Sequence, residues 1–361
     1  MLYADKYFTK SRMIAQKTGN DPIVKYRVFG RFEGMAALSP AKALINVLAP
    51  TAKVEILPEG TLIQPRDTIM TIEDKFSNVV ELETLYLQWA ALPCYTALQA
   101  SRIVSAAKGK DVLDFHARHL YGDDSVALAS YGAGVGGMRA FSTDLGANAY
   151  SYLMMKAAFY KSRTEANPFE HSPNKGIGTT PHAIIAIHGG NYVEMAKSYI
   201  DTFPDDNFVA LIDYNNREID DTILLLKEFG TKLYGIRIDT SGENVAQGVD
   251  APNTFEDVKL PTYRGVIPDA VKALRKALNE NCGEHVKIYV SSGFGPMKTL
   301  EFMKDCPESF DSIGTGSFIP KDTPTCTSDI MWVSGEKECK KGREWGYERD
   351  EFFSKNLLMV K

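Results

Sequence analysis

The sequence predicts an α/β protein in which an irregular, TIM-like βα barrel follows a smaller α+β domain. From Asp111 onward, short apolar segments alternate with segments of helical periodicity, which is the pattern of a parallel sheet. Polar side chains directly follow several of those apolar segments, and the carboxyl ends of barrel strands form the active-site face. We expect an N-terminal domain at 1–108, the barrel at 109–324, and a tail at 325–361 that packs back on the first domain.

The composition is that of a globular protein that acts on small molecules. The chain has 361 residues, of which 44% are hydrophobic and 24% charged, enough for two cores. A net charge of −5 argues against broad binding to nucleic acid or to a membrane surface. Five widely spaced cysteines without a Cys-x-x-Cys motif, and a start without an apolar signal segment, indicate a reducing cytoplasm.

The first domain mixes helices with short strands. Its expected elements are, in order, an amphipathic helix within 1–20, a strand at 23–32, a helix at 41–48 that Pro40 opens, and short strands separated by tight turns within 53–74. A long helix from about 79 to 108 then leads into the second domain. We expect Pro93 to kink or split this helix, because proline lacks the N–H that the helix needs.

The second domain is predicted as repeated βα units. The strand segments are 112–117, 208–213, 233–239, 286–291 and 312–314. The helix segments between them are 192–202, 218–229, 268–281 and 296–304. Because parallel strands end at one edge of a sheet, the residues that follow them should meet there. These residues include Asp114 and Arg118, then Asp213, then Arg237 and Asp239, then Ser291, Ser292 and Gly293, and finally Gly314 and Thr315.

One segment in the middle of the chain, 176–183, predicts an anion site. A turn containing Thr179 leads to Pro181, which suits the first turn of a helix, and His182 follows before an apolar run. Free backbone N–H groups at a helix start favour a phosphate or a carboxylate nearby. The alternative is that Thr179 or Thr180 caps the helix and that His182 is structural.

Two glycine-containing turns on the last two strands, Ser292-Gly293 and Gly314-Thr315-Gly316, predict phosphate loops, because glycine lets backbone N–H groups approach phosphate oxygens. The alternative is two ordinary βα turns.

Asp239 beside Arg237 is either an internal ion pair or a site for sugar hydroxyls and an anion. Asp213 and Asp239 could also place a Mg²⁺ ion that arrives on a polyphosphate; no residue set has the spacing of a resident metal site.

With these segments together, the chain resembles the nicotinate phosphoribosyltransferase family, among the type II phosphoribosyltransferases. The most specific match is to the family pattern Gly-Thr-x-Pro-His-Ala. The matching segments are Asp5-Lys6-Tyr7-Phe8, Glu83-Thr84-Leu85, Phe115-His116-Ala117-Arg118, Gly178-Thr179-Thr180-Pro181-His182-Ala183, Ile236-Arg237-Ile238-Asp239, Val290-Ser291-Ser292-Gly293 and Ile313-Gly314-Thr315.

The resemblance implies that nicotinate and 5-phosphoribosyl-1-pyrophosphate form nicotinate mononucleotide and pyrophosphate, within NAD biosynthesis. It implies ATP coupling through a phosphorylated His182, with Mg²⁺ carried by phosphoribosyl pyrophosphate and ATP. It implies that Arg237 and Arg118 hold the pyridine acid and the pyrophosphate, and that Asp239 binds the ribose hydroxyls.

It further implies that Gly293, Gly314 and Thr315 hold the 5′-phosphate. Tyr7 would stack on the pyridine ring from a partner subunit, so a homodimer with shared active sites is expected. This assignment agrees with the chemistry of the residues, because the pyridine nitrogen is already a nucleophile and the reaction needs positioning and charge stabilisation rather than a general base.

The chain also departs from the family. The pattern Phe-Gly-x-Arg-Arg becomes Phe115-His116-Ala117-Arg118-His119, so one glycine and one arginine are missing. Asp114 precedes this segment, and in the related nicotinamide enzymes an aspartate at the matching position favours the amide, because a carboxylate would repel nicotinate. Nicotinamide is therefore an alternative substrate. Quinolinate, with two carboxylates, is a weaker one. The departures also leave open a non-catalytic barrel that binds a phosphoribosyl ligand.

Overall fold

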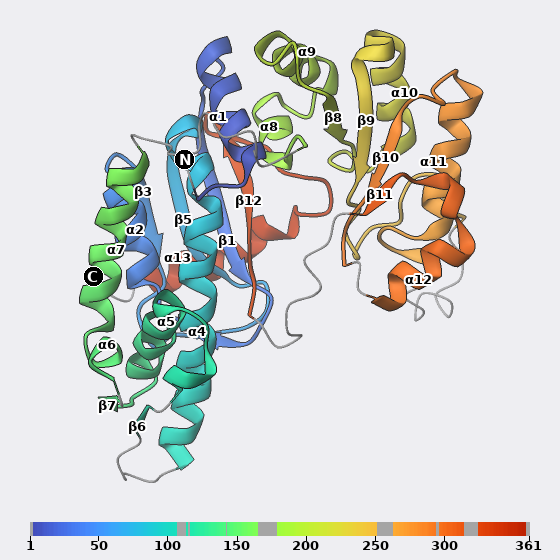
Figure 1. Cartoon of the computed structure of the whole chain (residues 1–361). Helices are drawn as coiled ribbons and strands as arrows, with labels where there is room; N and C mark the ends of the chain where they lie inside the picture. Colours follow the sequence, from blue (N-terminus) through green and yellow to red (C-terminus); the bar gives the residue numbers. More distant parts are fainter. Residues whose placement is uncertain are drawn as a thin grey trace.

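The computed structural model describes residues 3–106, 113–114, 116–141, 143–164, 179–250, 263–293, 296–313 and 324–358. Figure 1 shows two groups of strands, an antiparallel sheet with helices around it and a parallel sheet beside it. The fold is therefore a mixed α/β fold, as predicted.

The antiparallel sheet joins strands from the N-terminal domain with strands from the C-terminal tail. Its strand order is β13-β12-β1-β5-β3. The strands are β1 (Ile23–Gly30), β3 (Lys53–Ile56), β5 (Thr68–Lys75), β12 (Cys326–Val333) and β13 (Glu336–Lys337). The tail strand β12 runs antiparallel to β1, with Val24 opposite Val333 and Gly30 opposite Cys326. A small pair, β2 (Gly34–Met35) and β4 (Leu62–Ile63), lies outside this sheet.

Helices pack around this sheet, some mainly on its strands and others mainly on neighbouring helices. They are α1 (Lys6–Thr18), α2 (Ser39–Leu48), α3 (Phe76–Val79), α4 (Glu83–Ala106), α5 (Asp123–Val135), α6 (Asp144–Ala147), α7 (Ala149–Thr164) and α13 (Trp345–Leu358). The predicted split at Pro93 is wrong, because α4 runs through this residue as one helix. Helix α5 packs closely on it: a Cβ atom added to Gly132 would lie 2.3 Å from the carbonyl oxygen of Pro93.

The parallel sheet has the strand order β11-β10-β9-β8. The strands are β8 (Phe208–Leu211), β9 (Leu233–Ile238), β10 (Lys287–Val290) and β11 (Ser312–Ile313). The helices of this region are α8 (His182–Ile187), α9 (Tyr192–Thr202), α10 (Glu218–Phe229), α11 (Pro268–Glu280) and α12 (Pro296–Asp305). Their order follows the predicted βα alternation. The strands are short and mostly buried, as expected for a sheet with helices packed against it.

The described strands do not close into a barrel. The segment expected as the first barrel strand is β6 (Leu113–Asp114), which pairs in parallel with β7 (Ala140–Phe141). This pair lies near the far end of α4, away from β8–β11 (Figure 1). Because β6 takes its hydrogen bonds from β7 and not from β8, the parallel sheet stays open in the described part of the chain.

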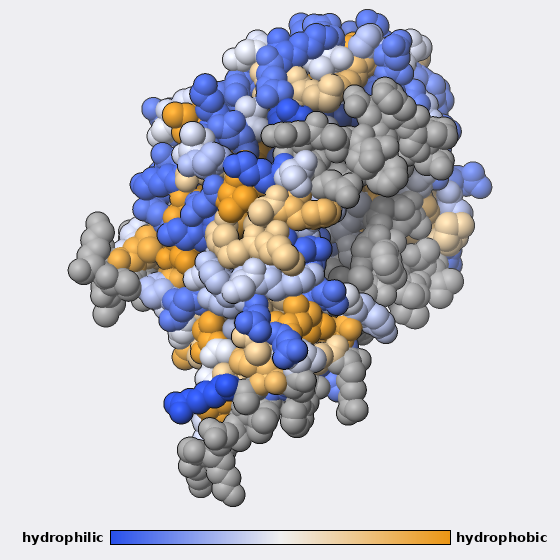
Figure 2. Space-filling view, turned by 60° about the vertical axis from the view of Figure 1, so that its left-hand side comes forward, coloured by the Kyte–Doolittle hydropathy of each residue, from blue (hydrophilic) through white to orange (hydrophobic). Residues whose placement is uncertain are grey.

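Three further features of the described residues concern membrane spans, cysteines and exposed apolar side chains. No described helix is long and apolar enough to cross a bilayer. All five cysteines are free thiols. Figure 2 shows apolar side chains on the face that carries α7, where Met155 and Phe159 are 61% and 41% exposed. A group of exposed apolar side chains on one helix is typical of a contact surface.

Candidate active site

The candidate site begins at the carboxyl ends of three neighbouring parallel strands. Asp213 lies just beyond β8, Asp239 follows β9, and Ser291 follows β10. The register pairs β9 with both β8 and β10, so their ends meet at one edge of the sheet. The Ser291 hydroxyl donates a hydrogen bond of 2.8 Å to Asp239, which holds this carboxylate in place.

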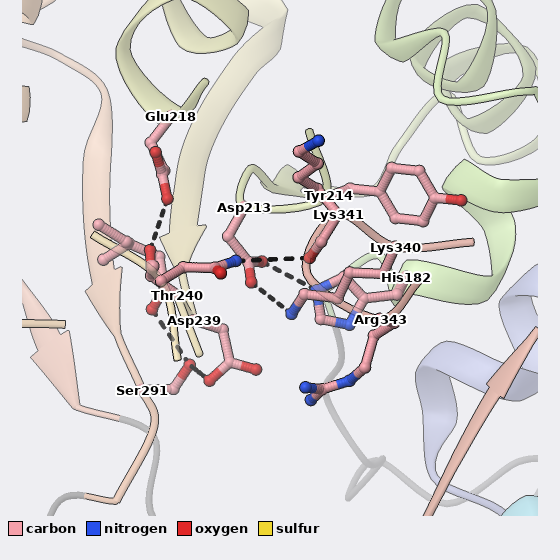
Figure 3. Close-up of polar contacts among 12 residues, drawn as sticks. His182, Asp213, Tyr214, Glu218, Asp239, Thr240, Ser291, Lys340, Lys341 and Arg343 are labelled. Carbon is pink, nitrogen blue, oxygen red and sulfur yellow. Dashed lines mark hydrogen bonds and ion pairs between the residues drawn. The ribbon is translucent and has the colours of Figure 1, made fainter. Parts of the chain in front are cut away.

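At the same edge, His182 and Lys340 share one carboxylate. Nε2 of His182 lies 2.9 Å from Oδ1 of Asp213, and Nζ of Lys340 lies 2.6 Å from Oδ2 (Figure 3). The backbone also ties the tail to this edge, because the N–H of Lys341 donates to the carbonyl of Tyr214 at 2.9 Å. His182 is the first residue of α8, directly after Pro181, so the histidine does stand at a helix start.

The electrostatics of this group follow from burial and charge. The side chain of Asp213 is fully buried, which alone would raise its pKa, but the ammonium group of Lys340 and the hydrogen bond from His182 hold that pKa far below its usual value. Burial, and then the Lys340 ammonium, lower the pKa of His182, against the opposing effect of Asp213. At neutral pH the carboxylate is therefore ionised and the imidazole neutral.

His182 faces a cavity of about 160 Å³. Its lining residues are Tyr7, Phe8, Tyr26, Glu83, Pro181, His182, Ala183, Ala186, Tyr214, Arg237, Asp239, Ser328, Asp329, Ile330 and Lys340. They come from α1, α4 and α8, from β1 and β12 of the antiparallel sheet, from the edge of the parallel sheet and from the tail after β13. Nε of Arg237 is buried and has no hydrogen-bond partner among the described residues. The cavity thus combines aromatic walls with a guanidinium group.

A second cavity of about 550 Å³ adjoins the first, since Glu83, His182 and Asp239 are among the residues that line both. Its wall combines basic side chains with carboxyl groups: Arg31, Arg66, Lys340 and Arg343 beside Glu83, Asp239, Glu243 and Asp329. Glu243 contacts Arg66 at 2.6 Å and Arg343 at 3.1 Å. Basic side chains around a polar cavity of this size suit an anionic substrate, and arginine in particular suits phosphate oxygens.

The structure gathers several of the predicted site residues. His182, Arg237, Asp239 and Tyr7 line the first cavity, and Asp213 lies behind His182. Tyr7 lines a cavity of its own chain, whereas the resemblance implied that it comes from a partner.

The predicted glycine loops are only partly described. Ser292 lines the second cavity with a φ of +77°, a left-handed conformation that is uncommon for a residue with a side chain. Gly293 follows in the same conformation and is exposed. Thr179 is half-buried, and its hydroxyl bonds to the Thr180 carbonyl at 3.4 Å. Gly314 and Thr315 lie outside the described residues.

Asp114 and Arg118 are placed elsewhere. Asp114 is 5% exposed in β6, where it accepts hydrogen bonds from the Ser130 hydroxyl and from the backbone N–H of His116. The backbone of Arg118 lies in the short helix Ala117–His119. Asp114 does not line either cavity, so within the described part of one chain this residue does not join the site. The side chain of Arg118 lies outside the described part.

Sequence reasoning missed Lys340, Glu83, Asp329 and Tyr26 as residues of the site. Lys340 belongs to a basic segment of the tail, Lys340-Lys341-Gly342-Arg343, and that cluster of charge was the signal that could have drawn attention to it. Asp329 lies on β12, which reaches the cavity because the tail pairs with β1. Long-range pairing of this kind leaves no local pattern in the sequence.

Comparison with known proteins finds relatives that carry one name. Nicotinate phosphoribosyltransferase pncB2 of Mycobacterium tuberculosis is 26% identical over 278 residues, covering 76% of this chain and 50% of the relative. Nicotinate phosphoribosyltransferase 2 of Arabidopsis thaliana is also 26% identical, over 261 residues, covering 62% of this chain and 46% of the relative. The resemblance to the nicotinate phosphoribosyltransferases is confirmed. No family model matches the chain.

Structure comparison agrees on the fold. The crystal structure of nicotinate phosphoribosyltransferase from Vibrio cholerae superposes with a TM-score of 0.56 at 12% identity, covering 99% of this chain and 92% of that one. The chain therefore shares the fold of a nicotinate phosphoribosyltransferase. It spans about half the length of the curated relatives that it matches.

Proposed function

We propose that the protein is a nicotinate phosphoribosyltransferase, which joins nicotinate to 5-phosphoribosyl-1-pyrophosphate and releases pyrophosphate. The observation that carries the proposal is the shared carboxylate of Asp213, which holds His182 and Lys340 at a cavity with a guanidinium group and aromatic walls. The names of the curated relatives agree with it.

The residues of the cavity suit the reaction. The guanidinium of Arg237 has unused donor capacity and would bind the carboxylate of nicotinate, while the ring of Tyr7 would pack against the pyridine. The pyridine nitrogen attacks ribose C1 as the bond from C1 to the pyrophosphate oxygen breaks. Asp239, fixed by Ser291, would bind the ribose hydroxyls and stabilise positive charge that develops on the ribose. The arginine side chains of the second cavity would receive the phosphates.

His182 has the geometry of a phosphoryl acceptor. Its Nε2 lies against Asp213, so Nδ1 is the ring nitrogen that is left to attack the terminal phosphorus of ATP with release of ADP. A lowered pKa keeps the imidazole neutral and its lone pair available. Asp213 would hold the proton on Nε2 and offset the positive charge that the ring gains when Nδ1 is phosphorylated. ATP coupling through this residue is part of the proposal.

Mg²⁺ fits this site as an ion that arrives with the phosphates. The described residues hold no cluster of three or more candidate metal ligands. Mg²⁺ typically uses one or two carboxylates together with substrate phosphates and water. Asp213 already bonds His182 and Lys340, so Asp239 is the carboxylate better placed to contact the ion. Mg²⁺ would supply charge neutralisation for the pyrophosphate.

The test is a product assay with purified protein, phosphoribosyl pyrophosphate and Mg²⁺, in which nicotinate and nicotinamide are each offered with and without ATP. We expect nicotinate mononucleotide, formed faster with ATP. His182→Asn should abolish the acceleration by ATP. Nicotinamide mononucleotide as the main product would reassign the substrate, and no product with either pyridine would contradict the enzyme proposal.

We also propose a homodimer. Its support is the exposed apolar surface of α7, which carries Met155 and Phe159. Light scattering after size-exclusion chromatography should give twice the mass of the chain. A paired change, Met155→Glu with Phe159→Glu, should shift the protein to the monomer, and a dimer that survives this change would place the interface elsewhere.

A further inference from the structure

Tyr26 carries a buried hydroxyl that the fold does not use. The residue lies in the middle of β1 and is 1% exposed, yet its hydroxyl has no hydrogen-bond partner among the described residues. It lines the cavity that His182 and Arg237 share. A buried polar group without a partner costs free energy, so a hydroxyl at this position calls for a role outside the stability of the protein.

Glu83 stands beside it. This residue begins α4 and lines both cavities. Burial, and then the neighbouring carboxyls of Asp329 and Asp5, raise the pKa of Glu83 well above its usual value. Burial, and then Glu83, raise the pKa of Tyr26. The raised pKa keeps the proton on Tyr26 at neutral pH and favours the protonated form of Glu83, in which the carboxyl can donate a hydrogen bond.

We propose that Tyr26 and Glu83 contact the substrate and that each donates a hydrogen bond to the carboxylate of the pyridine, together with Arg237. The inference rests on the proposed function and adds to it the residues that recognise the ring substituent. Two neutral donors and one guanidinium group match the acceptor oxygens of a carboxylate. A pyridine with an apolar substituent would leave all three donors unpaired, so the site should select an acidic pyridine.

The test compares Tyr26→Phe with Tyr86→Phe. Both tyrosines are buried, but the Tyr86 hydroxyl contacts the Ser328 hydroxyl at 2.8 Å, and Tyr86 does not line either cavity. Tyr26→Phe should raise the KM for nicotinate at least about tenfold, which corresponds to the loss of one hydrogen bond to a charged group, with little change in the KM for phosphoribosyl pyrophosphate. Its melting temperature should stay the same or rise. Tyr86→Phe should lower the melting temperature and leave both KM values unchanged.

An unchanged KM for nicotinate in Tyr26→Phe would overturn the inference, as would a lower melting temperature with both KM values raised alike. Glu83→Gln keeps a donor and should leave the KM for nicotinate within about twofold, whereas Glu83→Ala should raise it as Tyr26→Phe does. Tighter binding of nicotinate by Glu83→Gln would mean that Glu83 is charged and repels the substrate, which overturns its role as a donor.

The role of Tyr26 can be tested even if the proposed enzyme activity fails. If the wild-type protein makes no product from any pyridine, the proposed enzyme activity fails. Titration of nicotinate into wild-type and Tyr26→Phe protein, followed by intrinsic fluorescence, then still decides the role of Tyr26. Weaker binding by Tyr26→Phe supports the contact, and equal affinity or no binding to either protein overturns it.

Discussion

The ammonium group of Lys340 lies 2.6 Å from a carboxylate oxygen of Asp213, although the two residues are 127 positions apart in the chain. Lys340 is 5% exposed and the side chain of Asp213 is fully buried, so this ion pair lies almost entirely inside the protein. The pair fixes the tail to the edge of the parallel sheet, and through Asp213 it fixes His182. One contact therefore serves both the packing of the tail and the geometry of the site.

Lys340→Met should destabilise the protein by about 3–5 kcal/mol, because it leaves a buried carboxylate without its cation. Urea denaturation measures this loss in the free energy of unfolding. Lys341→Met is the matched control: its side chain is 65% exposed and only 3.6 Å from Glu344, so the change should cost less than about 1 kcal/mol. Equal losses in the free energy of unfolding would show that the buried ion pair stabilises the protein no more than the exposed one.

Acid should destabilise the protein in a way that depends on His182. Burial, and then Lys340, lower the pKa of His182 in the folded state, so the unfolded chain binds the proton more readily. The contribution of His182 to stability is complete above its usual pKa of about 6.5 and is lost as the pH falls through the lower, folded-state value. His182→Asn should reduce the loss of stability between about pH 7 and pH 5. If the free energy of unfolding falls equally with pH in wild type and variant, the expected effect of His182 is contradicted.

Gly132→Ala should destabilise the contact between α4 and α5. The added Cβ would lie 2.3 Å from the carbonyl oxygen of Pro93 and 2.2 Å from the Thr96 hydroxyl, so the helices must separate, at a cost of about 1–3 kcal/mol. Gly134→Ala is the control in the same helix. Its Cβ would meet Phe141 at 3.5 Å, an ordinary contact, and the change should stabilise α5 by up to about 1 kcal/mol. Thermal unfolding of both variants compares them, and equal melting temperatures would refute the close crossing.

Ser291→Ala should weaken the proposed transfer reaction without unfolding the site. The Ser291 hydroxyl donates to Asp239 at 2.8 Å, and its loss leaves the carboxylate less well positioned for the ribose hydroxyls. We expect kcat/KM for phosphoribosyl pyrophosphate to fall about fivefold to tenfold, which corresponds to about 1 kcal/mol. The KM for nicotinate should change little. An equal rise in both KM values would indicate general disorder of the site instead.

The periodicity of the sequence was sufficient to locate the local elements. The helix expected at 218–229 is α10 with the same bounds, and the strand expected at 208–213 contains β8 (Phe208–Leu211). Pro93 shows the limit of such rules. A proline breaks an isolated helix, but α4 is held by the close packing of α5 on its surface, and tertiary contact overrides the local preference.

The sequence by itself determined which chemical groups the site can use. Asp213, Asp239 and Ser291 follow apolar strand segments, and His182 stands before an apolar helix, so their neighbourhood followed from the geometry of parallel strands. The tertiary structure alone decided that β12 of the tail pairs with β1, that Lys340 meets Asp213, and that β6 pairs with β7 instead of closing a barrel. The physical reason is that these contacts join distant segments through register and burial, which depend on the whole core and leave no periodic trace in the chain.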